Sequence, residues 1–347
     1  MLHTHLPYLK HNGVWPSGED LFHQAVSESY LPLLEMFGRL ADDGFTDVCT
    51  LGVSPMVGHQ LADDHMLDEL GWFLGRYEPR AIRNAVMYEG AHRDEVRALA
   101  GFYATWARRR CESLDAQVAV HGDLRSAFAS LGARGVVELL GGPLTHPLMP
   151  ETHPHLAELQ MRLGRQAFAG TDWGGIWLPE CHYRPGVEET LDRQSVTHLV
   201  VDGPTMIRSG GDTTRPRRIA DSAVVAFARD LDSTYKVWSP TGGYPSGKWY
   251  RDFFHYDIEA GFKDWRVTGT RKPLHQKRPY EPQAAIAAAR TDAADFVAHI
   301  VRTLQERTTT EEPDPMIVAA YDTELFGHWW FEGPVFLEEV LRTLAAS

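Results

Sequence analysis

The sequence predicts an α/β fold in which seven parallel strands form a closed or nearly closed barrel covered by helices. Three observations support this prediction. Seven short apolar runs typical of buried strands each end in Gly, Pro, Asp or a polar cluster. Helical patterns separate the runs, and no glycine-rich phosphate-binding motif of the open, doubly wound sheets follows any of them.

The predicted strands are distributed along the whole chain. Their ranges are Met1–His3, Val48–Val53, Val136–Leu140, Gly175–Leu178, His198–Val201, Ala223–Ala228 and Ile317–Tyr321. The first is only a stub, because the chain starts at Met1. An open sheet is the alternative arrangement for seven such strands, and the missing phosphate-binding glycines make the barrel the preferred interpretation.

The segments between the strands carry apolar residues that recur every three or four positions, which is typical of amphipathic helices. Ser or Asp residues that can cap a helix stand near several of their starts. The predicted helical segments are Leu21–Leu40, Ala81–Leu131, Pro154–Phe168, Gly186–Gln194 and Ala284–Gln305. Strands that alternate with helices in this way are expected to pair in parallel.

One stretch, Ser233–Arg278, is rich in Gly, Pro, Trp and Tyr and has no clear period. We therefore expect a long excursion, about residues 233–278, between the sixth and seventh strands. Excursions at strand ends usually serve binding. No internal repeat or linker divides the chain, so we expect residues 1–347 to form one barrel domain.

The composition excludes some classes of partner. The chain has 347 residues, of which 34 are basic and 47 acidic, and its formal net charge is −13. This balance argues against nucleic acids and anionic membranes as partners. The start of the chain lacks the pattern of a signal peptide, and nowhere do eighteen apolar residues run together. Three widely spaced cysteines suggest no disulfide framework, so we expect a cytoplasmic protein, whose oligomeric state the sequence does not indicate.

Two acidic residues follow predicted strands directly. Glu180 comes after a buried strand that Pro179 ends, and Asp322 follows the last strand. Trp329 and Trp330 stand close behind Asp322, where they can exclude water and raise the pKa of a carboxyl. Hydrolysis or transfer of a glycosidic bond needs two such carboxyls. The alternative is that each acid caps a helix or pairs with an Arg.

A His-x-His pair follows the first strand. Strand alternation directs His3 and His5 to the same side, where they can hydrogen-bond sugar hydroxyls. A metal site is the alternative, completed by Asp202 or by Glu180 and His182. One such pair without a second spaced pair is a weak metal signal, so we expect neither a metal nor another cofactor.

Glu138 lies inside an apolar strand, where an unpaired charge is costly. We expect it to point into the barrel, to hydrogen-bond a His or Arg and to contact the substrate. Several of the ten tryptophans, among them Trp15 and Trp265, stand beside Gly, Pro or charged residues rather than inside apolar runs. Such rings can stack on the apolar faces of sugars, although ordinary core tryptophans are the alternative.

Four motifs resemble signature regions of glycoside hydrolase family 57, in the family's order and over nearly the whole chain. They are His3-Thr4-His5-Leu6-Pro7, Glu138-Leu139-Leu140-Gly141, Trp177-Leu178-Pro179-Glu180-Cys181 and Tyr321-Asp322-Thr323-Glu324-Leu325-Phe326-Gly327-His328-Trp329-Trp330-Phe331-Glu332-Gly333. The last motif is long and specific. The closest likeness is to the glycogen branching enzymes of the family.

The resemblance implies a (β/α)7 barrel, an incomplete relative of the TIM barrel. It also implies retaining double displacement on α-1,4-glucan, with Glu180 as nucleophile and Asp322 as acid/base, and formation of α-1,6 branches. A loop similar to Val237–Gly247 closes over the site in branching enzymes, and its tyrosine, Tyr244 here, favours transfer over hydrolysis. Trp15 and Trp265 match aromatic sugar-binding positions.

Two departures from the family pattern stand out. The family's first strand begins several residues earlier, and its members continue past the last motif into a helical domain, so we expect a truncated first strand and no such domain in this chain. An α-amylase or a 4-α-glucanotransferase is the alternative within the family. A metal-dependent deacetylase-like hydrolase and a non-catalytic glucan-binding protein are the alternatives from other classes.

Overall fold

A computed structural model describes residues 1–15, 17–87, 94–167, 173–239, 241–256, 261–269, 271–309 and 314–346. The strands are β1 Leu2–Thr4, β2 Cys49–Val53, β3 Val137–Leu140, β4 Gly175–Trp177, β5 His198–Val201, β6 Arg217–Arg218, β7 Val225–Ala228 and β8 Tyr321–Asp322. The α-helices are α1 Glu19–Ala25, α2 Leu31–Asp42, α3 Pro55–Leu61, α4 Asp64–Gly75, α5 Tyr77–Met87, α6 Asp94–His121, α7 Leu124–Ala133, α8 Pro154–Ala167, α9 Val187–Arg193, α10 Gly203–Arg208, α11 Leu231–Trp238, α12 Pro282–Arg307 and α13 Gly333–Ala345. A π-helical segment, η1 Val26–Tyr30, joins α1 to α2.

Within the described residues, the strands form two sheets, ordered β3-β2-β1-β8 and β4-β5-β7-β6, and every ladder between them except that of β6 and β7 is parallel. Single parallel bridges, Gly141 to Ile176 and Arg229 to Val318, connect the sheets at both of their junctions. Seven parallel strands thus follow one another around a barrel whose ladder is interrupted at two places. The predicted seven-stranded barrel is confirmed, with each strand found close to its predicted range; β6 was not predicted.

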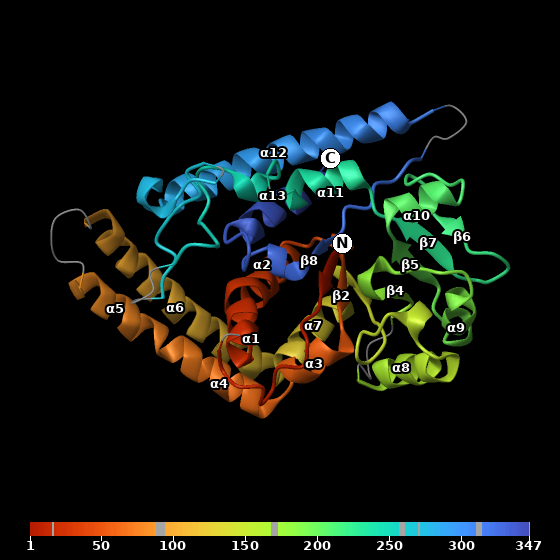
Figure 1. The fold of residues 1–347 in the computed structure, drawn as a ribbon, viewed down its shortest axis with the longest axis horizontal. Coiled ribbons are helices and arrows are strands. Elements are labelled where there is room, and N and C mark those ends of the chain that lie inside the picture. The colour runs from red at the N-terminus through yellow and green to blue at the C-terminus, as the bar shows by residue number, and fades with distance from the viewer. Residues whose placement is uncertain are drawn as a thin grey trace.

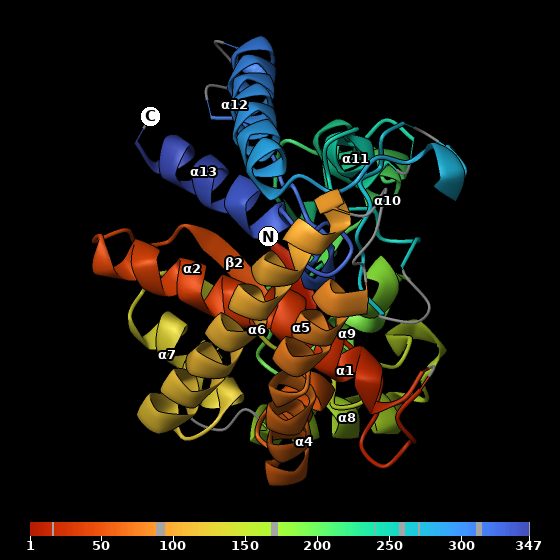
Figure 2. The same ribbon diagram turned by 90° about the vertical axis from the view of Figure 1, so that its left-hand side faces the viewer.

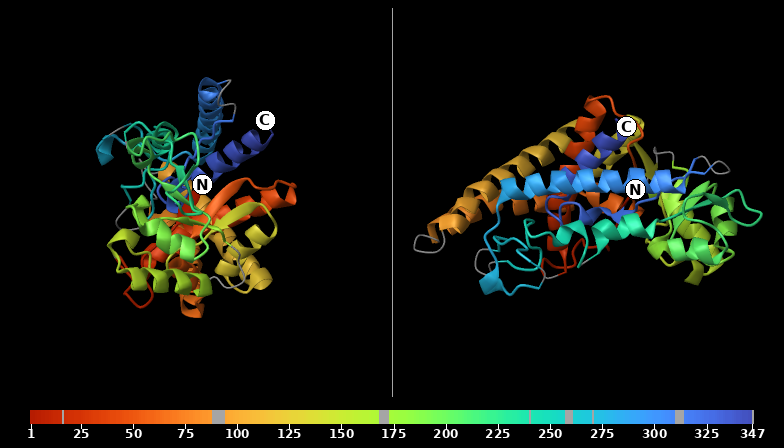
Figure 3. Two further views of the ribbon diagram at one scale, coloured as in Figure 1. Left: turned by 90° about the vertical axis from the view of Figure 1, so that its right-hand side faces the viewer. Right: turned by 90° about the horizontal axis from the view of Figure 1, so that it is seen from above.

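Helices surround the strands unevenly (Figure 1). The antiparallel neighbours α5 and α6 extend away from the barrel on one side, and Figure 2 shows them side by side. α12 crosses the molecule in the view from above in Figure 3 and packs against α13. Among the described helices, none combines the length and the apolar composition that a membrane crossing requires.

Side chains cap several helices where the sequence changes from strand to helix. Ser54 accepts from the backbone N–H of Val57 at the start of α3, and Asp230 accepts from that of Ser233 at 2.8 Å at the start of α11. The prediction of an irregular excursion over 233–278 is wrong for its first six residues, because they belong to the helix α11. Parts of that stretch, and parts of the predicted helical segments (88–93 and Phe168), lie outside the described residues.

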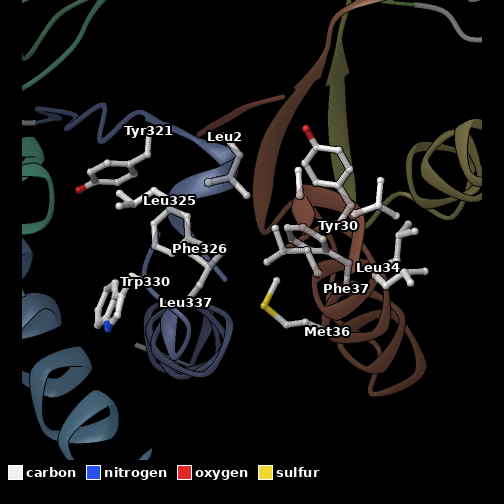
Figure 4. Close-up of a cluster of buried hydrophobic side chains, with 14 of the residues drawn as sticks. Leu2, Tyr30, Leu34, Met36, Phe37, Tyr321, Leu325, Phe326, Trp330 and Leu337 are labelled. Carbon is white, nitrogen blue, oxygen red and sulfur yellow. The ribbon is translucent and has the colours of Figure 1, made fainter. Parts of the chain in front are cut away.

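A large apolar core lies between the β1–β8 edge of the barrel and the helices α2 and α13, as Figure 4 shows. The labelled members are Leu2, Tyr30, Leu34, Met36, Phe37, Tyr321, Leu325, Phe326, Trp330 and Leu337. β1 has only three residues, but it is buried and pairs with a neighbour on each side. The N-terminal amine of Met1 donates to the carbonyl oxygen of Ala319 at 2.8 Å, which extends the contact between β1 and β8.

Candidate active site

Glu180 and Asp322 line the same cavity, which has a volume of about 350 Å³. The other lining residues are His3, His5, Leu6, His146, Trp177, Cys181, Arg229, Trp238, Glu324 and Trp329. Most of them lie at or just after the carboxyl ends of β1, β4, β7 and β8. Because parallel strands of a barrel end on one face, their following residues meet there. The predicted pairing of the two acids in one cleft therefore agrees with the structure.

The backbone around Glu180 is strained. β4 ends at Trp177, and Pro179 begins a single 3-10 turn, η3, that ends at Cys181. Glu180 has φ +56° and Cys181 has φ +50°, so two consecutive non-glycine residues adopt the left-handed conformation. Such residues cost of the order of 1–3 kcal/mol each and cluster at functional sites. The surrounding fold holds this turn against the strain, which supports a functional role for Glu180.

Asp322 is an acid that keeps its proton up to about pH 6. Burial and the charge of Glu180 together raise the pKa of Asp322 from 3.8 to about 6, although the charge of Arg229 partly opposes them. Arg229 in turn binds one carboxylate oxygen of Asp202 through Nε at 2.9 Å. A carboxyl protonated in this range beside a second carboxyl is what a general acid requires.

Three imidazoles, those of His3, His5 and His146, form one side of the cavity. The ring of His146 lies 3.9 Å from that of His5 and 4.9 Å from that of His3, and His3 stacks on Trp177 at 5.2 Å. Burial lowers the pKa of His5 to about 4 and that of His146 to about 3, and it lowers the pKa of His3 as well. The three side chains are therefore uncharged at neutral pH and can offer hydrogen bonds to hydroxyl groups.

Two of the three predicted metal partners, Asp202 and His182, are bound elsewhere, whereas Glu180 lines the same cavity as His3 and His5. His182 pairs with Glu151 at 3.1 Å, and Asp202 binds Arg229. In the described part of the chain, the His, Cys, Asp and Glu side chains with metal-binding spacing form a group that includes neither His3 nor His5. The contacts around these two histidines instead favour hydrogen bonding to a polar substrate.

The last motif is anchored beneath the cavity by the buried carboxylate of Glu28 in the π-helical segment. Glu28 accepts from Arg251 at 2.7 Å and from Nδ1 of His328 at 2.7 Å. Gly327 has φ +117°, and a Cβ at that position would lie 1.9 Å from the carbonyl oxygen of Glu28. Only glycine fits there, so the turn after Asp322 is held by close backbone contact as well as by charge.

Glu324 is a third carboxyl of the cavity, and it is buried against the hydroxyl of Tyr30, which donates to it. Burial raises the pKa of Glu324, and after the opposing effect of the hydrogen bond from Tyr30 the pKa is about 8 instead of 4.5. The protonated form is therefore the one that the folded chain stabilises at neutral pH.

This pKa predicts that the stability of the chain falls between about pH 4.5 and about pH 8. Because the folded chain binds the proton of Glu324 more tightly than the unfolded chain, the free energy of unfolding falls as pH rises from about 4.5 through about 8. The slope from this group reaches about 1.4 kcal/mol per pH unit. Urea unfolding at several pH values should show that Glu324→Gln removes this part of the slope. An unchanged slope in the variant would contradict the assignment.

The two adjacent tryptophans of the last motif point in different directions. Trp329 lines the cavity, and its ring meets that of Trp238 edge-on at 5.7 Å. Trp330 is 1% exposed and packs on Phe336 at 4.8 Å in the core of Figure 4. The prediction that both tryptophans exclude water from the site is therefore wrong for Trp330, because a tight turn sends neighbouring side chains to opposite sides.

A larger cavity of about 800 Å³ adjoins the first and shares Trp238 and Trp329 with it. Most of its remaining lining comes from the segment between Val237 and Lys277. The excursion predicted from the sequence thus supplies a concave surface beside the two acids. A bound polymer that is too long for the smaller cavity could continue into this one.

Glu138 does not reach the cavity of Glu180 and Asp322. It lies at the second position of β3 and lines another cavity together with Met1, Thr50 and His198. Its carboxylate accepts from Thr50 at 3.0 Å and pairs with His198 at 3.3 Å, so the predicted hydrogen bond to a His is confirmed. The substrate contact predicted for Glu138 is not supported by this placement, because residues early in a strand lie far from its carboxyl end.

Three predicted aromatic contacts also lie outside the lining of the first cavity. Tyr244 donates its hydroxyl proton to Asp295 of α12 at 2.5 Å, and its ring packs on Phe336. Trp265 is half-buried and bridges through its backbone to Pro279. Trp15 is 75% exposed in the loop before α1.

Several residues of the cavity were not predicted as site residues. They are Leu6, His146, Trp177, Cys181, Arg229, Trp238 and Glu324. Arg229 directly follows β7, so the rule that found Glu180 could have found it. His146 lies in a loop six residues after β3 and has φ +55°, which no sequence pattern indicates.

Comparisons with known proteins agree with the motifs. A sequence profile described as Glycosyl hydrolase family 57 matches residues 1–346. A probable 1,4-alpha-glucan branching enzyme of Mycobacterium tuberculosis is 39% identical over 372 residues, covering 100% of this chain and 68% of the relative.

Solved structures of similar fold extend the comparison. The crystal structure of a branching enzyme of the same family from Thermococcus kodakaraensis has a TM-score of 0.92 at 30% identity, over 99% of this chain and 67% of that one. That of an alpha-amylase from Thermotoga maritima has a TM-score of 0.86 at 26% identity, over 100% and 71%. The chain spans about two thirds of each of these proteins.

Proposed function

The chain belongs to glycosyl hydrolase family 57, and on this premise we propose that it is a 1,4-α-glucan branching enzyme, which cleaves α-1,4-glucan and rejoins it through α-1,6 bonds. The observation that carries the proposal is the meeting of Glu180 and Asp322 in one cavity beside an aromatic wall. Glu180 stands on a strained turn, and the raised pKa of Asp322 suits a proton donor.

In the first step, the carboxylate of Glu180 attacks the anomeric carbon of an α-1,4 bond. The bond from this carbon to the leaving oxygen breaks, and Asp322 gives that oxygen its proton. A glycosyl ester on Glu180 results. In the second step, the carboxylate of Asp322 takes the proton of a glucosyl 6-hydroxyl, whose oxygen displaces Glu180 and forms the α-1,6 bond with the original configuration retained.

The outcome of the second step depends on which hydroxyl reaches the ester first. Trp238 and Trp329 lie between the two cavities and can shield the ester from water. The cavity of about 800 Å³ has room for a second glucan segment. His3 and His5 would hydrogen-bond sugar hydroxyls at the cleavage point. Trp15 and Trp265 would stack on glucose units further along the bound glucan.

Tyr244 fits a role as the anchor of this shield. Its hydroxyl is bound to Asp295, while its neighbours Pro245 and Ser246 line the larger cavity. Tyr244→Ala should free the segment and raise hydrolysis relative to transfer by about fivefold, since one hydrogen bond and its packing contribute about 1 kcal/mol. Tyr244→Phe, which keeps the packing, should change the ratio less. Equal ratios in wild type and Tyr244→Ala would refute this role.

The adjacent tryptophans should separate substrate binding from stability. Trp329→Ala should raise KM for amylose about tenfold, since loss of stacking removes about 1.4 kcal/mol, with little change in unfolding. Trp330→Ala should lower the free energy of unfolding by about 3–5 kcal/mol, because it opens a cavity in the core. Kinetics on amylose and urea unfolding of both variants would check this. The reverse assignment of effects would contradict the observed orientations.

The proposed reaction would serve the assembly of glycogen-type glucan. Residues 1–347 would act as one catalytic unit. Cys49, Cys111 and Cys181 are free thiols, which suits a reducing cytoplasm.

Amylose provides the decisive test. The protein and its Glu180→Gln variant are incubated with amylose, and reducing ends and α-1,6 links are measured together. New α-1,6 links without a matching rise in reducing ends are expected for the wild type alone. Reducing ends alone would indicate an α-amylase, and chains lengthened through α-1,4 bonds would indicate a 4-α-glucanotransferase. Binding of amylose without any turnover would indicate a non-catalytic glucan-binding protein.

A further inference from the structure

A second group of chemistry-bearing side chains lies apart from the catalytic cavity, where the loop before α1 meets α4. His11, Glu19 and His65 each direct a possible ligand atom to one place, and these atoms lie within 4.8 Å of one another. None of the three lines the cavities described above. The proposed glucan chemistry does not use them.

The fold assembles the group from three separate segments. Glu19 is the first residue of α1, and one of its carboxylate oxygens accepts from the backbone N–H of His11 at 2.7 Å and from Nε2 of His65 at 3.0 Å. His65 lies in the first turn of α4, and its ring is 4.5 Å from that of His11. His11 has φ +60°, so the backbone adopts an uncommon conformation where the imidazole joins the group.

The carboxylate of Glu19 is buried and is 6% exposed. In the described part of the chain, its bonding partners are a backbone N–H and an imidazole rather than a Lys or Arg. A buried carboxylate without a Lys or Arg partner is a favourable place for a cation.

A fourth side chain, on the same helix as Glu19, is also buried. His23 lies one helical turn after Glu19 on the same face of α1, and it is 3% exposed. Within the described residues, its Nε2 has no hydrogen-bond partner. Burial lowers the pKa of His23 to about 4, so the ring is neutral and can act as a ligand. Buried polar atoms are rarely left unpaired without a functional reason.

We propose that His11, Glu19 and His65 bind a divalent transition-metal ion of the Zn²⁺ type. Two imidazoles and one carboxylate are a typical zinc donor set, and water would complete the coordination. The ion replaces the hydrogen bond between His65 and Glu19, and it ties the loop of His11 to both α1 and α4.

The loop held in this way carries Trp15, four residues after His11 and 75% exposed. If Trp15 stacks on glucan, which rests on the proposed function, the ion fixes the position of that ring. Metal removal should then raise KM for amylose severalfold without changing kcat. The catalytic acids are unaffected, because they lie in a different cavity.

Metal binding is tested directly, without any activity. The full chain, freed of metal with a chelator, is titrated with Zn²⁺ by equilibrium dialysis, and with Co²⁺, whose visible absorption reports tetrahedral coordination. The compared variants are His11→Asn, which tolerates the positive φ, and His65→Ala, with His121→Ala as a matched control on α6. Wild type and control should bind one equivalent at least about tenfold more tightly than the other two.

Two further readouts make the result decisive. Saturating Zn²⁺ should raise the Tm of wild type and of His121→Ala but not of His11→Asn. Equal stoichiometry, affinity and Tm shift in all four proteins would overturn the site. A Tm equal to that of the metal-free wild type shows that a metal-free variant is still folded. If Zn²⁺ binds as expected but the KM for amylose does not respond, the metal site stands and the link to Trp15 falls.

Discussion

A Glu180→Gln variant is expected to lose both transfer and hydrolysis of α-glucan by about 10⁴- to 10⁶-fold while its fold is preserved. The amide has nearly the same shape as the carboxylate but cannot form the glycosyl ester. Glu180 stands on a strained turn after β4, whereas the other carboxyls that line the cavity, Asp322 and Glu324, lie at the end of β8 and just after it. Steady-state turnover of amylose and urea unfolding of both proteins would measure the two halves of this expectation.

A matched control and a chemical rescue sharpen this test. Glu189→Gln removes an exposed glutamate of α9 whose side chain is 73% accessible, so activity should stay within about twofold. In Glu180→Ala, azide can enter the vacated space and attack the anomeric carbon from the same face. The expected product is a glucosyl azide of inverted configuration. Activity of Glu180→Gln within tenfold of the wild type would remove Glu180 from the mechanism.

Loss of the general acid should have the second largest effect. Asp322→Asn is expected to lower kcat/KM for amylose by about 10²- to 10⁴-fold. In the wild type, the pKa of Asp322 is raised from 3.8 to about 6, so the proton is present below that pH and is lost above it. The kcat/KM of the wild type should therefore fall as pH rises through about 6, and the variant should lack this limb.

Leaving-group chemistry and a neighbouring charge provide the controls. A maltooligosaccharide with a nitrophenolate leaving group needs little proton transfer, so Asp322→Asn should cleave it with a much smaller defect. Arg229→Gln should move the falling limb of the wild-type profile to higher pH, because Arg229 lowers the pKa of Asp322. A limb that stays in place in both variants would show that another group controls it.

The catalytic pair and the barrel were predictable because each depends on local pattern. A buried parallel strand is an apolar run that a breaker ends, and the residue after it must emerge on the carboxyl face of the barrel. Glu180 and Asp322 follow this rule, and the same rule could have predicted Arg229 as a residue of the cavity. The seven strand ranges were predicted to within a few residues, since burial on both faces leaves a continuous apolar signal.

Side-chain direction within irregular segments was not predictable. Trp329 and Trp330 are identical in type and adjacent, yet one lines the cavity and the other fills the core. Tyr244 appears in the expected motif, but packing against α12 and the carboxylate of Asp295 decide where its hydroxyl lies. His146 joins the two predicted histidines only because the loop after β3 folds back over the barrel.

By itself the sequence determined the chemistry that is available: two carboxyls at strand ends, a pair of histidines and a supply of aromatic rings, all placed by local periodicity. The tertiary structure alone decided which of these groups share a cavity and in which protonation state. Burial sets the pKa of Asp322 and of the three imidazoles, and burial depends on segments hundreds of residues apart. Local patterns carry no record of such distant contacts.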